Sequence, residues 1–369
     1  MHRNQNIQNT SLFLLLILVS LGLLTSFKTP GLIVLQDEKV NFKPTGFYIA
    51  GIEDDRVNKN AIAQLQVKVQ AGKTTAQSAD LQGGPAPAIG KFINRNLPKD
   101  ETQRPVIINI KELNITETPL DASRVSGNVK LSLAFGLQKD YGTETLVNYQ
   151  GGFTYTRLTD NIADAETHLR KTVVNSLAFF NNWMKANIPA NVKLARNVKI
   201  SFSNYQDKQE GDTIYYAANR PLTWADFQSK YISRSPSYAA GIMPGFGYDE
   251  QANTNEGTIY VNITMKTFLP KSTCWYKYGY KDDVTLNHEQ RHFDVVKIIT
   301  EQYKQKVLAQ HLKPDTYEAF INMQYLDSYR DMDEMQKAYD KETSHGRDPY
   351  AQAQWNDRID KQLRMGTRL

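Results

Sequence analysis

The C-terminal third of the chain constrains the fold most strongly, because an alternating segment is followed there by two long segments of helical periodicity. From Gly257 to Phe268 apolar and polar side chains alternate, which is typical of a strand with one buried face. The segment from Asp283 to Val307 contains no Pro or Gly and carries an apolar stripe at steps of three and four residues. A second helix is expected from about Asp315 to Thr343, ended by Gly346, and a short third helix closes the chain.

The first half of the chain is mostly strand-like and includes one long helix. Alternating segments run over Ala63–Val69, Pro105–Leu113 and Gly127–Leu137, and a further strand, or a strand pair interrupted at Gly151 and Gly152, runs over Thr145–Leu158. A helix is expected from Asn161 to Asn187, with His168 as a surface or packing residue. The small, polar and turn-rich segment 71–90 is expected to be a long mobile loop.

These patterns predict an α+β chain of two domains. Residues 31–205 would form a mostly-β domain with one long helix and no catalytic constellation. Residues 206–369 would form the second domain, with a small sheet, a long helical hairpin and a capping box at Thr223 and Asp226.

The N-terminus, residues 1–30, has the pattern of a secretory signal. His2 and Arg3 precede an apolar run from Leu12 to Leu24, shorter than the roughly 20 residues that span a bilayer as a helix. No A-x-A-like cleavage site follows, so an uncleaved N-terminal anchor is the alternative. In either case we expect the body of the protein to be secreted or to lie in the cell envelope, with membrane contact only through that anchor.

Composition limits the kinds of site and partner. Cys274 is the only cysteine, which excludes an intrachain disulfide and a thiolate metal cluster. The formal net charge is +5 and no Lys/Arg block is present, so no nucleic-acid partner is indicated. Any metal must therefore be bound by nitrogen and oxygen atoms, and the oligomeric state is left open.

The segment "LNHEQRHFD" (286–294) places His288, Glu289 and His292 in an H-E-x-x-H pattern on the first of the two long helices. Residues four apart on a helix lie one above the other, so both imidazoles face one point. Glu289 lies beside them, where it can take a proton from water activated by Zn²⁺. This is the zinc-peptidase arrangement, and Asp282 or Asp283 can cap the helix that carries it.

Catalytic zinc usually takes three protein ligands, so a third must come from elsewhere. If the two long helices form an antiparallel hairpin about Lys313, Glu334 and Ala338 lie opposite the two histidines, and the segment 331–345 passes the metal. That segment offers four candidates, Glu334, Asp340, Glu342 and His345. Hairpin geometry alone does not choose among them.

"LNHEQRHFD" together with "YDKETSHG" (339–346) resembles a bacterial family of predicted secreted zinc-dependent proteases, mostly uncharacterised, in which a Y-D-x-x-T-x-H-G block follows the H-E-x-x-H helix. The matching residues are Tyr339, Asp340, Thr343, His345 and Gly346. "RPLTWADF" and "SPSYAAGIMPGFGY" also resemble family segments, so the likeness covers roughly 211–355. It implies a zincin-like domain with His345 as third ligand and Asp340 or Thr343 in support. Alternatively, a carboxylate ligates and His345 binds a transition-state oxyanion.

For other residues near the motif the sequence suggests one or two roles each. Asp294 either fixes a ligand imidazole by a hydrogen bond or is a solvated helix residue. Tyr339 either donates to an oxyanion or has a structural role. The strand 258–268 either holds an extended peptide along its edge or is an ordinary part of the sheet. The helix side that carries Arg291, Lys297, Glu301 and Lys304 is expected to be solvated, and His311 to be a helix C-terminal cation.

The sequence therefore predicts a secreted or envelope zinc metallopeptidase that acts on a peptide or protein substrate, with Glu289 as general base. The rival is a non-catalytic envelope binding or structural protein whose metal site is structural or vestigial. A further alternative keeps the same chemistry but hydrolyses a non-peptide amide, such as one in cell-wall material.

Overall fold

The structure, a computed structural model, describes residues 31–70, 73–206, 209–235 and 238–366. The predicted secretory signal lies outside these residues. Helices and strands both contribute extensively, which confirms the α+β class. The chain separates into two compact units, Met1–Lys185 and Ala186–Leu369, each considered by itself below. None of the helices in the described ranges is long and apolar enough to cross a membrane.

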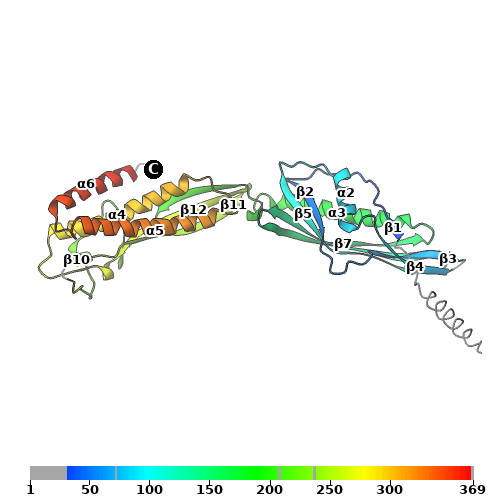
Figure 1. Ribbon diagram of the computed structural model, residues 1–369, viewed down its shortest axis with the longest axis horizontal. Coiled ribbons are helices and arrows are strands. Elements are labelled where there is room, and N and C mark those ends of the chain that lie inside the picture. Colours follow the sequence, from blue (N-terminus) through cyan, green and yellow to red (C-terminus); the bar gives the residue numbers. More distant parts are fainter. Residues whose placement is uncertain (1–30, 71–72, 207–208, 236–237, 367–369) are drawn as a thin grey trace, which may run out of the picture. The chain divides into compact units, whose positions relative to one another are not determined.

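The first unit is built on a seven-stranded sheet in the order β1-β4-β3-β5-β6-β7, with β2 paired to β5 (Figure 1). Its strands are β1 (Gly31–Ile33), β2 (Phe47–Asp54), β3 (Ala63–Gln70), β4 (Lys73–Leu81), β5 (Arg104–Pro119), β6 (Arg124–Lys139) and β7 (Gly142–Leu158). The three longest strands, β5 to β7, are antiparallel neighbours, whereas β2 runs parallel to β5.

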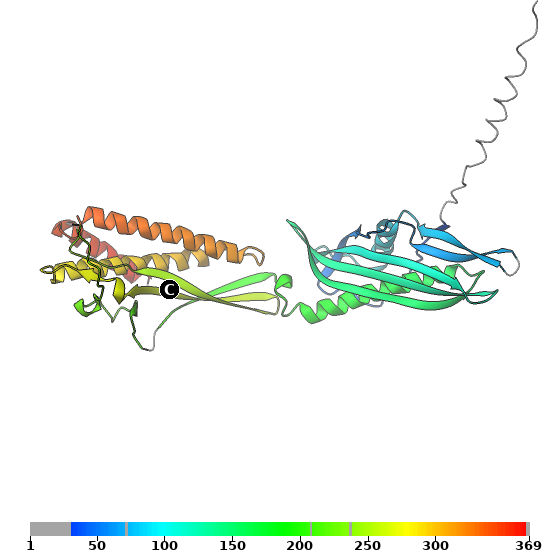
Figure 2. The same ribbon diagram turned by 90° about the horizontal axis from the view of Figure 1, so that it is seen from below.

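Two helices accompany this sheet, α2 (Pro85–Asn96) and α3 (Ala163–Asn187), and α3 lies along one face of it (Figure 2). Phe180 of α3 stacks on Phe135 of β6 with ring centroids 4.3 Å apart and meets Phe47 of β2 edge-on at 4.8 Å. His168 stacks on Tyr155 of β7 at 4.5 Å. The prediction that His168 is a packing residue is thus confirmed.

The segment 71–90 was expected to be a mobile loop, and this was wrong for its described part. Lys73–Leu81 forms β4, which pairs with β3, and α2 begins at Pro85. Only Ala79 and Leu81 of β4 are buried, so the strand shows little alternation in sequence. Gly83 and Gly84, at φ +81° and +90°, reverse the chain between the two elements.

The glycine pair at 151–152 does not interrupt β7, which runs unbroken from Gly142 to Leu158. A Cβ atom on Gly152 would lie 2.1 Å from the carbonyl oxygen of Val129 on β6. Glycine is therefore required there by the close approach of two backbones. Of the two alternatives, a single strand or an interrupted strand pair, the single strand is confirmed.

The second unit holds a four-stranded sheet in the order β11-β12-β8, with β9 also paired to β12, and a two-stranded sheet of β10 and β13. The strands are β8 (Asn197–Asn204), β9 (Thr213–Tyr215), β10 (Ala240–Gly241), β11 (Gly245–Asn255), β12 (Thr258–Pro270) and β13 (Trp275–Tyr276). Short 3-10 helices lie at η1 (Val192–Leu194), η2 (Trp224–Asp226) and η3 (Lys271–Thr273), and η2 carries the expected capping box at Thr223 and Asp226.

The pairing of these strands corrects one expectation and decides between two alternatives for another. We placed the domain boundary after residue 205, but β8 pairs in parallel with β12, so the chain divides after Lys185 instead. For β12 the sequence left two alternatives, a substrate edge or an ordinary part of the sheet. The second holds, because β11 covers one edge of β12 and β8 and β9 cover the other. The alternation of a strand shows which face is buried and says nothing of its partners.

Three helices complete the second unit: α4 (Asp283–Leu308), α5 (Tyr317–Glu342) and α6 (Pro349–Gly366). Asp282 caps α4, because its side chain accepts a hydrogen bond from the Thr285 backbone N–H at 2.8 Å. The apolar stripe of α4 is buried among residues of β11, β12 and α5, as the periodicity predicts; its members are Val296, Ile299, Tyr303 and Val307. This packing sets α4 and α5 side by side (Figures 1 and 2).

The side of α4 that we expected to be solvated is partly covered, so that prediction was wrong. Arg291 donates to Asp360 of α6 at 2.6 Å and to Asp294 at 2.9 Å. Lys304 is only 7% exposed and donates to the side chains of Asn204 and Glu301. Because α6 and β8 contribute partners, these charged side chains are held in specific ion pairs and hydrogen bonds.

Candidate metal centre

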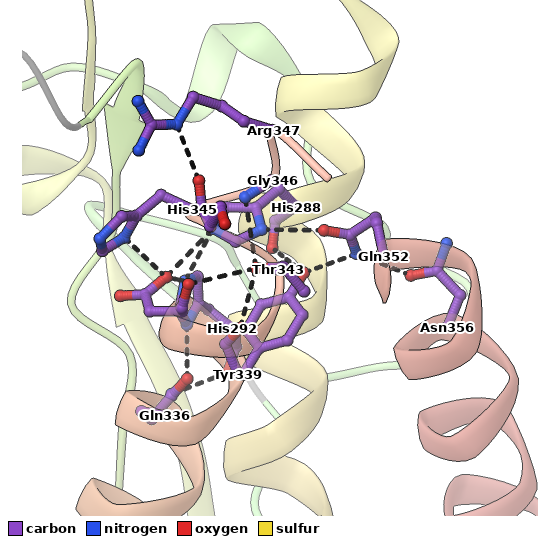
Figure 3. Close-up of polar contacts among 12 residues, drawn as sticks. His288, His292, Gln336, Tyr339, Thr343, His345, Gly346, Arg347, Gln352 and Asn356 are labelled. Carbon is purple, nitrogen blue, oxygen red and sulfur yellow. Dashed lines mark hydrogen bonds and ion pairs between the residues drawn. The ribbon is translucent and has the colours of Figure 1, made fainter. Parts of the chain in front are cut away.

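The first half of α4 faces the end of α5, and the two motif histidines meet α5 there (Figure 3). The rings of His288 and His292 are edge to face, with centroids 4.8 Å apart. His288 Nε2 and His292 Nε2 lie 3.3 Å from each other. The four-residue spacing on one helix produces this approach, as the sequence predicts.

The third member of the group is Asp340 of α5. Its Oδ1 atom lies 3.2 Å from His288 Nε2 and 3.0 Å from His292 Nε2. In the described part of the chain, these three are the one set of His, Cys, Asp or Glu side chains whose ligand atoms lie within 4.8 Å of one another. His288, His292 and Asp340 therefore form a candidate metal-binding triad.

The separations within this triad match a tetrahedral site. Four ligands at 2.0–2.1 Å from a zinc ion in tetrahedral geometry would be about 3.3 Å apart. The three edges of the triangle measure 3.0, 3.2 and 3.3 Å. Two imidazole nitrogens and one carboxylate oxygen are also a ligand set that zinc accepts, so the residues present fit the metal.

Each ligand histidine has a glutamine at its other ring nitrogen. Gln352 Oε1 of α6 lies 3.0 Å from His288 Nδ1, and Gln336 Oε1 of α5 lies 2.5 Å from His292 Nδ1. The sequence analysis missed both. Gln336 had a signal, because it precedes Asp340 by the same four residues that separate the histidines, whereas Gln352 had none.

Tyr339 supports the site instead of facing a substrate. Its side chain is buried, its ring stacks on His288 at 4.8 Å, and its hydroxyl donates to the His288 carbonyl oxygen at 3.2 Å. The same hydroxyl accepts a hydrogen bond from Gln352 at 2.7 Å. Burial also raises the pKa of Tyr339. Because its hydroxyl is fully engaged, the expectation that it donates to an oxyanion was wrong.

A tight turn after α5 closes over His288. Ser344, His345 and Gly346 have φ values of +51°, +55° and +75°, a run of left-handed residues. The Thr343 hydroxyl, which donates to the Tyr339 carbonyl, accepts from the Gly346 N–H at 3.2 Å. A Cβ atom on Gly346 would lie 3.0 Å from His288 Cγ, so only glycine fits against the ring without displacement.

This turn places His345 beside the triad but not in it. His345 Nδ1 lies 3.3 Å from Asp340 Oδ1, without the geometry of a hydrogen bond, and this nitrogen atom is buried with no hydrogen-bond partner among the described residues. Its ring packs against Tyr238 with centroids 4.5 Å apart. The resemblance favoured His345 as third ligand, whereas the structure brings Asp340 to that position and leaves His345 adjacent.

Glu289 is buried next to the histidines, with 3% of its surface exposed. Burial raises the pKa of Glu289, while both motif histidines and a backbone hydrogen bond from Ile242 act in the opposite direction. Ile242 directly follows β10, so the small sheet helps to hold this carboxylate. A buried carboxylate outside the ligand group is what a general base beside the metal requires.

The triad is electrostatically self-consistent. Burial alone would raise the pKa of Asp340, but hydrogen bonds and charge from His288 and His292 outweigh it and lower that pKa. Burial would lower the pKa of His292, but Asp340 and Glu289 outweigh it and raise that pKa. The ionised Asp340 carboxylate and a charged His292 ring therefore stabilise each other.

The remaining candidate carboxylates do not join the site. Asp294 is buried and accepts from Tyr216, Gln290 and Arg291, so neither of its expected roles was right. Glu342 accepts from Trp355 at 2.8 Å, and Glu334 is exposed on α5.

The contacts His288–Asp340 and His292–Gln336 share a midpoint at residue 314. The expected hairpin centre at Lys313 was therefore one residue early, which placed Glu334 and Ala338 where Gln336 and Asp340 lie.

No protein-family model matches the chain, and no curated protein matches it. Among solved structures, protein XCC0632 from Xanthomonas campestris, of family DUF330, shares 11% identity over 42% of this chain and 94% of its own, with TM-score 0.24. A minor lipoprotein from Acinetobacter baumannii shares 10% identity over 27% of this chain and 80% of its own, with TM-score 0.19. An uncharacterised protein shares 7% identity over 42% of this chain and 99% of its own, with TM-score 0.23. At these TM-scores the likeness carries no argument about function.

Proposed function

We propose that this protein is a zinc-dependent hydrolase that cleaves peptide bonds outside the cytoplasm. The observation that carries the proposal is the triangle of His288 Nε2, His292 Nε2 and Asp340 Oδ1, whose edges of 3.0 to 3.3 Å suit a tetrahedral zinc ion. The H-E-x-x-H spacing and the resemblance of residues 211–355 to secreted zinc-dependent proteases support the same reaction class.

In this proposal His288, His292 and Asp340 hold the metal. Zinc, when bound, supplies a Lewis acid that polarises the scissile carbonyl and lowers the pKa of water to about 7. Glu289 accepts the proton of the attacking water and delivers it to the leaving amine, which its burial beside the histidines suits. His345, whose Nδ1 atom faces Asp340 at 3.3 Å, stabilises the oxyanion of the substrate through its Nε2 atom.

In this proposal an extended peptide binds beside these residues, along β10. β10 pairs with β13 on one edge, and its other edge has no strand partner among the described residues. The residues flanking β10 reach the site on both sides, since Ile242 bonds to Glu289 and Tyr238 packs on His345. A substrate backbone added along β10 would therefore pass the proposed general base and oxyanion donor.

The rival reading is a structural metal site in a non-catalytic envelope protein. A closed structural zinc site has four protein ligands. The cluster within the described residues supplies three, which leaves one coordination position for water or substrate. Glu289 would also have no use at a structural site. Both points favour the hydrolase. The signal-like N-terminus supports a secreted or envelope location, with Zn²⁺ as cofactor and a peptide or protein as partner.

The test is elemental analysis of the purified chain after zinc is supplied and the excess removed, followed by a screen against an unbiased peptide mixture. We expect one zinc per chain and cleavage that a chelator abolishes. No zinc in the wild type would overturn the proposal. Zinc without cleavage in the wild type, together with a fourth protein ligand by X-ray absorption, would establish the structural-site reading.

A further inference from the structure

A glutamine amide lies at the Nδ1 atom of each of the two motif histidines. We infer that Gln352 of α6 and Gln336 of α5 are positioning residues that fix which nitrogen of each histidine faces the metal. The inference rests on the proposed metal site and extends it to α6, which no part of the H-E-x-x-H pattern includes. The chemical role is to hold the Nδ1 hydrogen of each imidazole, so that Nε2 is the nitrogen left to ligate.

The orientation of the Gln352 amide follows from its other contacts. Its Nε2 atom donates to the Tyr339 hydroxyl at 2.7 Å and to Asn356 Oδ1 at 2.9 Å, which uses both amide hydrogens. A reversed amide would place an oxygen against Asn356 Oδ1, two acceptors in contact. The Tyr339 hydroxyl could not compensate, because it already donates to the His288 carbonyl. Gln352 Oε1 therefore faces His288 Nδ1, and only an N–H group satisfies it there.

Gln336 acts on His292 in the same way. Its Nε2 atom donates to the His292 backbone carbonyl at 3.0 Å, which turns its Oε1 atom toward His292 Nδ1 at 2.5 Å. Both Nδ1 atoms must then carry hydrogen, and both Nε2 atoms present a lone pair when the imidazoles are neutral. The two nitrogens converge with Asp340 Oδ1 at 3.0 to 3.3 Å, an arrangement of electron-rich atoms that a cation relieves.

The plane of the His288 ring is confined by its neighbours. Tyr339 stacks on it at 4.8 Å, and Gly346 approaches so closely that an added Cβ would lie 3.2 Å from Nδ1. Gln352 is 5% exposed and is brought to the ring by α6, which packs on α4 and α5 through Trp355 and Ile359. Docking of α6 and metal binding are therefore coupled through one amide.

The test measures zinc affinity of the full chain by competition with a chromophoric chelator. Loss of a group that orients a metal ligand typically weakens metal binding 10–100-fold. We expect this weakening, of about that size, in Gln352→Leu and in Gln336→Leu. The control is Gln354→Leu, an exposed residue on the same helix, which should leave the affinity unchanged.

Thermal unfolding of the metal-free variants separates positioning from packing. If Gln352→Leu lowers the melting temperature but binds zinc as the wild type does, the glutamine is only a packing residue and the inference is overturned. If Gln352→Leu does not fold, Gln336→Leu on a different helix decides by the same measure. A wild type that binds no zinc would overturn the proposed function instead, so the two failures are distinguishable.

Discussion

His288 Nε2 lies 3.2 Å from Asp340 Oδ1, although 52 residues separate the two in the chain. The antiparallel packing of α4 and α5 brings the end of one helix to the beginning of the other. A carboxylate thereby completes a candidate metal-binding triad, of which the H-E-x-x-H pattern supplies only two members.

Replacing Asp340 by alanine and replacing His345 by alanine should have different effects on the zinc content. We expect Asp340→Ala to lose bound zinc, because it removes one of three ligands, whereas His345→Ala should keep about one zinc per chain and lose hydrolysis. Elemental analysis of both variants makes the comparison. Asp333→Ala is the matched control, since Asp333 lies exposed on the same helix and pairs with Lys337. Zinc retained in Asp340→Ala and lost in His345→Ala would restore the ligand set that the resemblance implies.

Glu289→Gln should separate metal binding from catalysis. The amide is nearly the same size but accepts no proton, so hydrolysis should fall by roughly 10²- to 10⁴-fold. The zinc content should be unchanged, because Glu289 is outside the ligand triad. Activity close to that of the wild type would exclude Glu289 as the general base.

Gly346→Ala should disturb the site through a single added methyl group. At φ +75° an alanine pays about 1–2 kcal/mol of backbone strain, and its Cβ atom would also lie 3.0 Å from His288 Cγ. We expect a loss of about 2–4 kcal/mol in the free energy of unfolding, with weaker zinc binding. Denaturant unfolding and chelator competition measure the two effects.

Gly279→Ala is the control for that experiment. Gly279 has φ +89°, but nothing lies within 4 Å of an added Cβ atom. It should therefore show the backbone cost of about 1–2 kcal/mol alone and bind zinc normally. Equal effects of the two substitutions would mean that the contact with His288 has no consequence.

The first unit should lose stability in acid through Asp54. Hydrogen bonds from the Arg56 guanidinium hold the pKa of Asp54 at about 2, below its ordinary value of 3.8. A carboxylate whose folded pKa is lowered stabilises the fold above its unfolded pKa, and this contribution is lost as the pH falls from about 4 through 2. Asp54→Asn should cost about 1 kcal/mol at pH 5 and nothing near pH 2, measured by urea unfolding. A cost independent of pH would show that the charge has no part in it.

Local patterns in the sequence predicted the elements whose own residues carry the signal. The strand 258–268, the α4 helix with its cap at Asp282, and the buried stripe that ends at Val307 appear as expected. The position of His288 and His292 on one helix face follows from four-residue spacing alone. Failures came where the signal was weak, as in β4, a strand with few buried side chains.

Tertiary structure decided everything that depends on register between distant segments. A shift of one residue in the centre of the α4–α5 hairpin places Gln336 and Asp340, instead of Glu334 and Ala338, opposite the two histidines. Helix periodicity predicts which face is buried but not how far one helix is displaced along another. The partners of β12 and the approach of Gln352 from α6 depend on the same kind of long-range packing. The sequence by itself determined two candidate metal ligands and the proposed general base, because all three lie on one helix. Only the packing of α5 and α6 against α4 could bring the third candidate ligand and the two glutamine amides to the histidines.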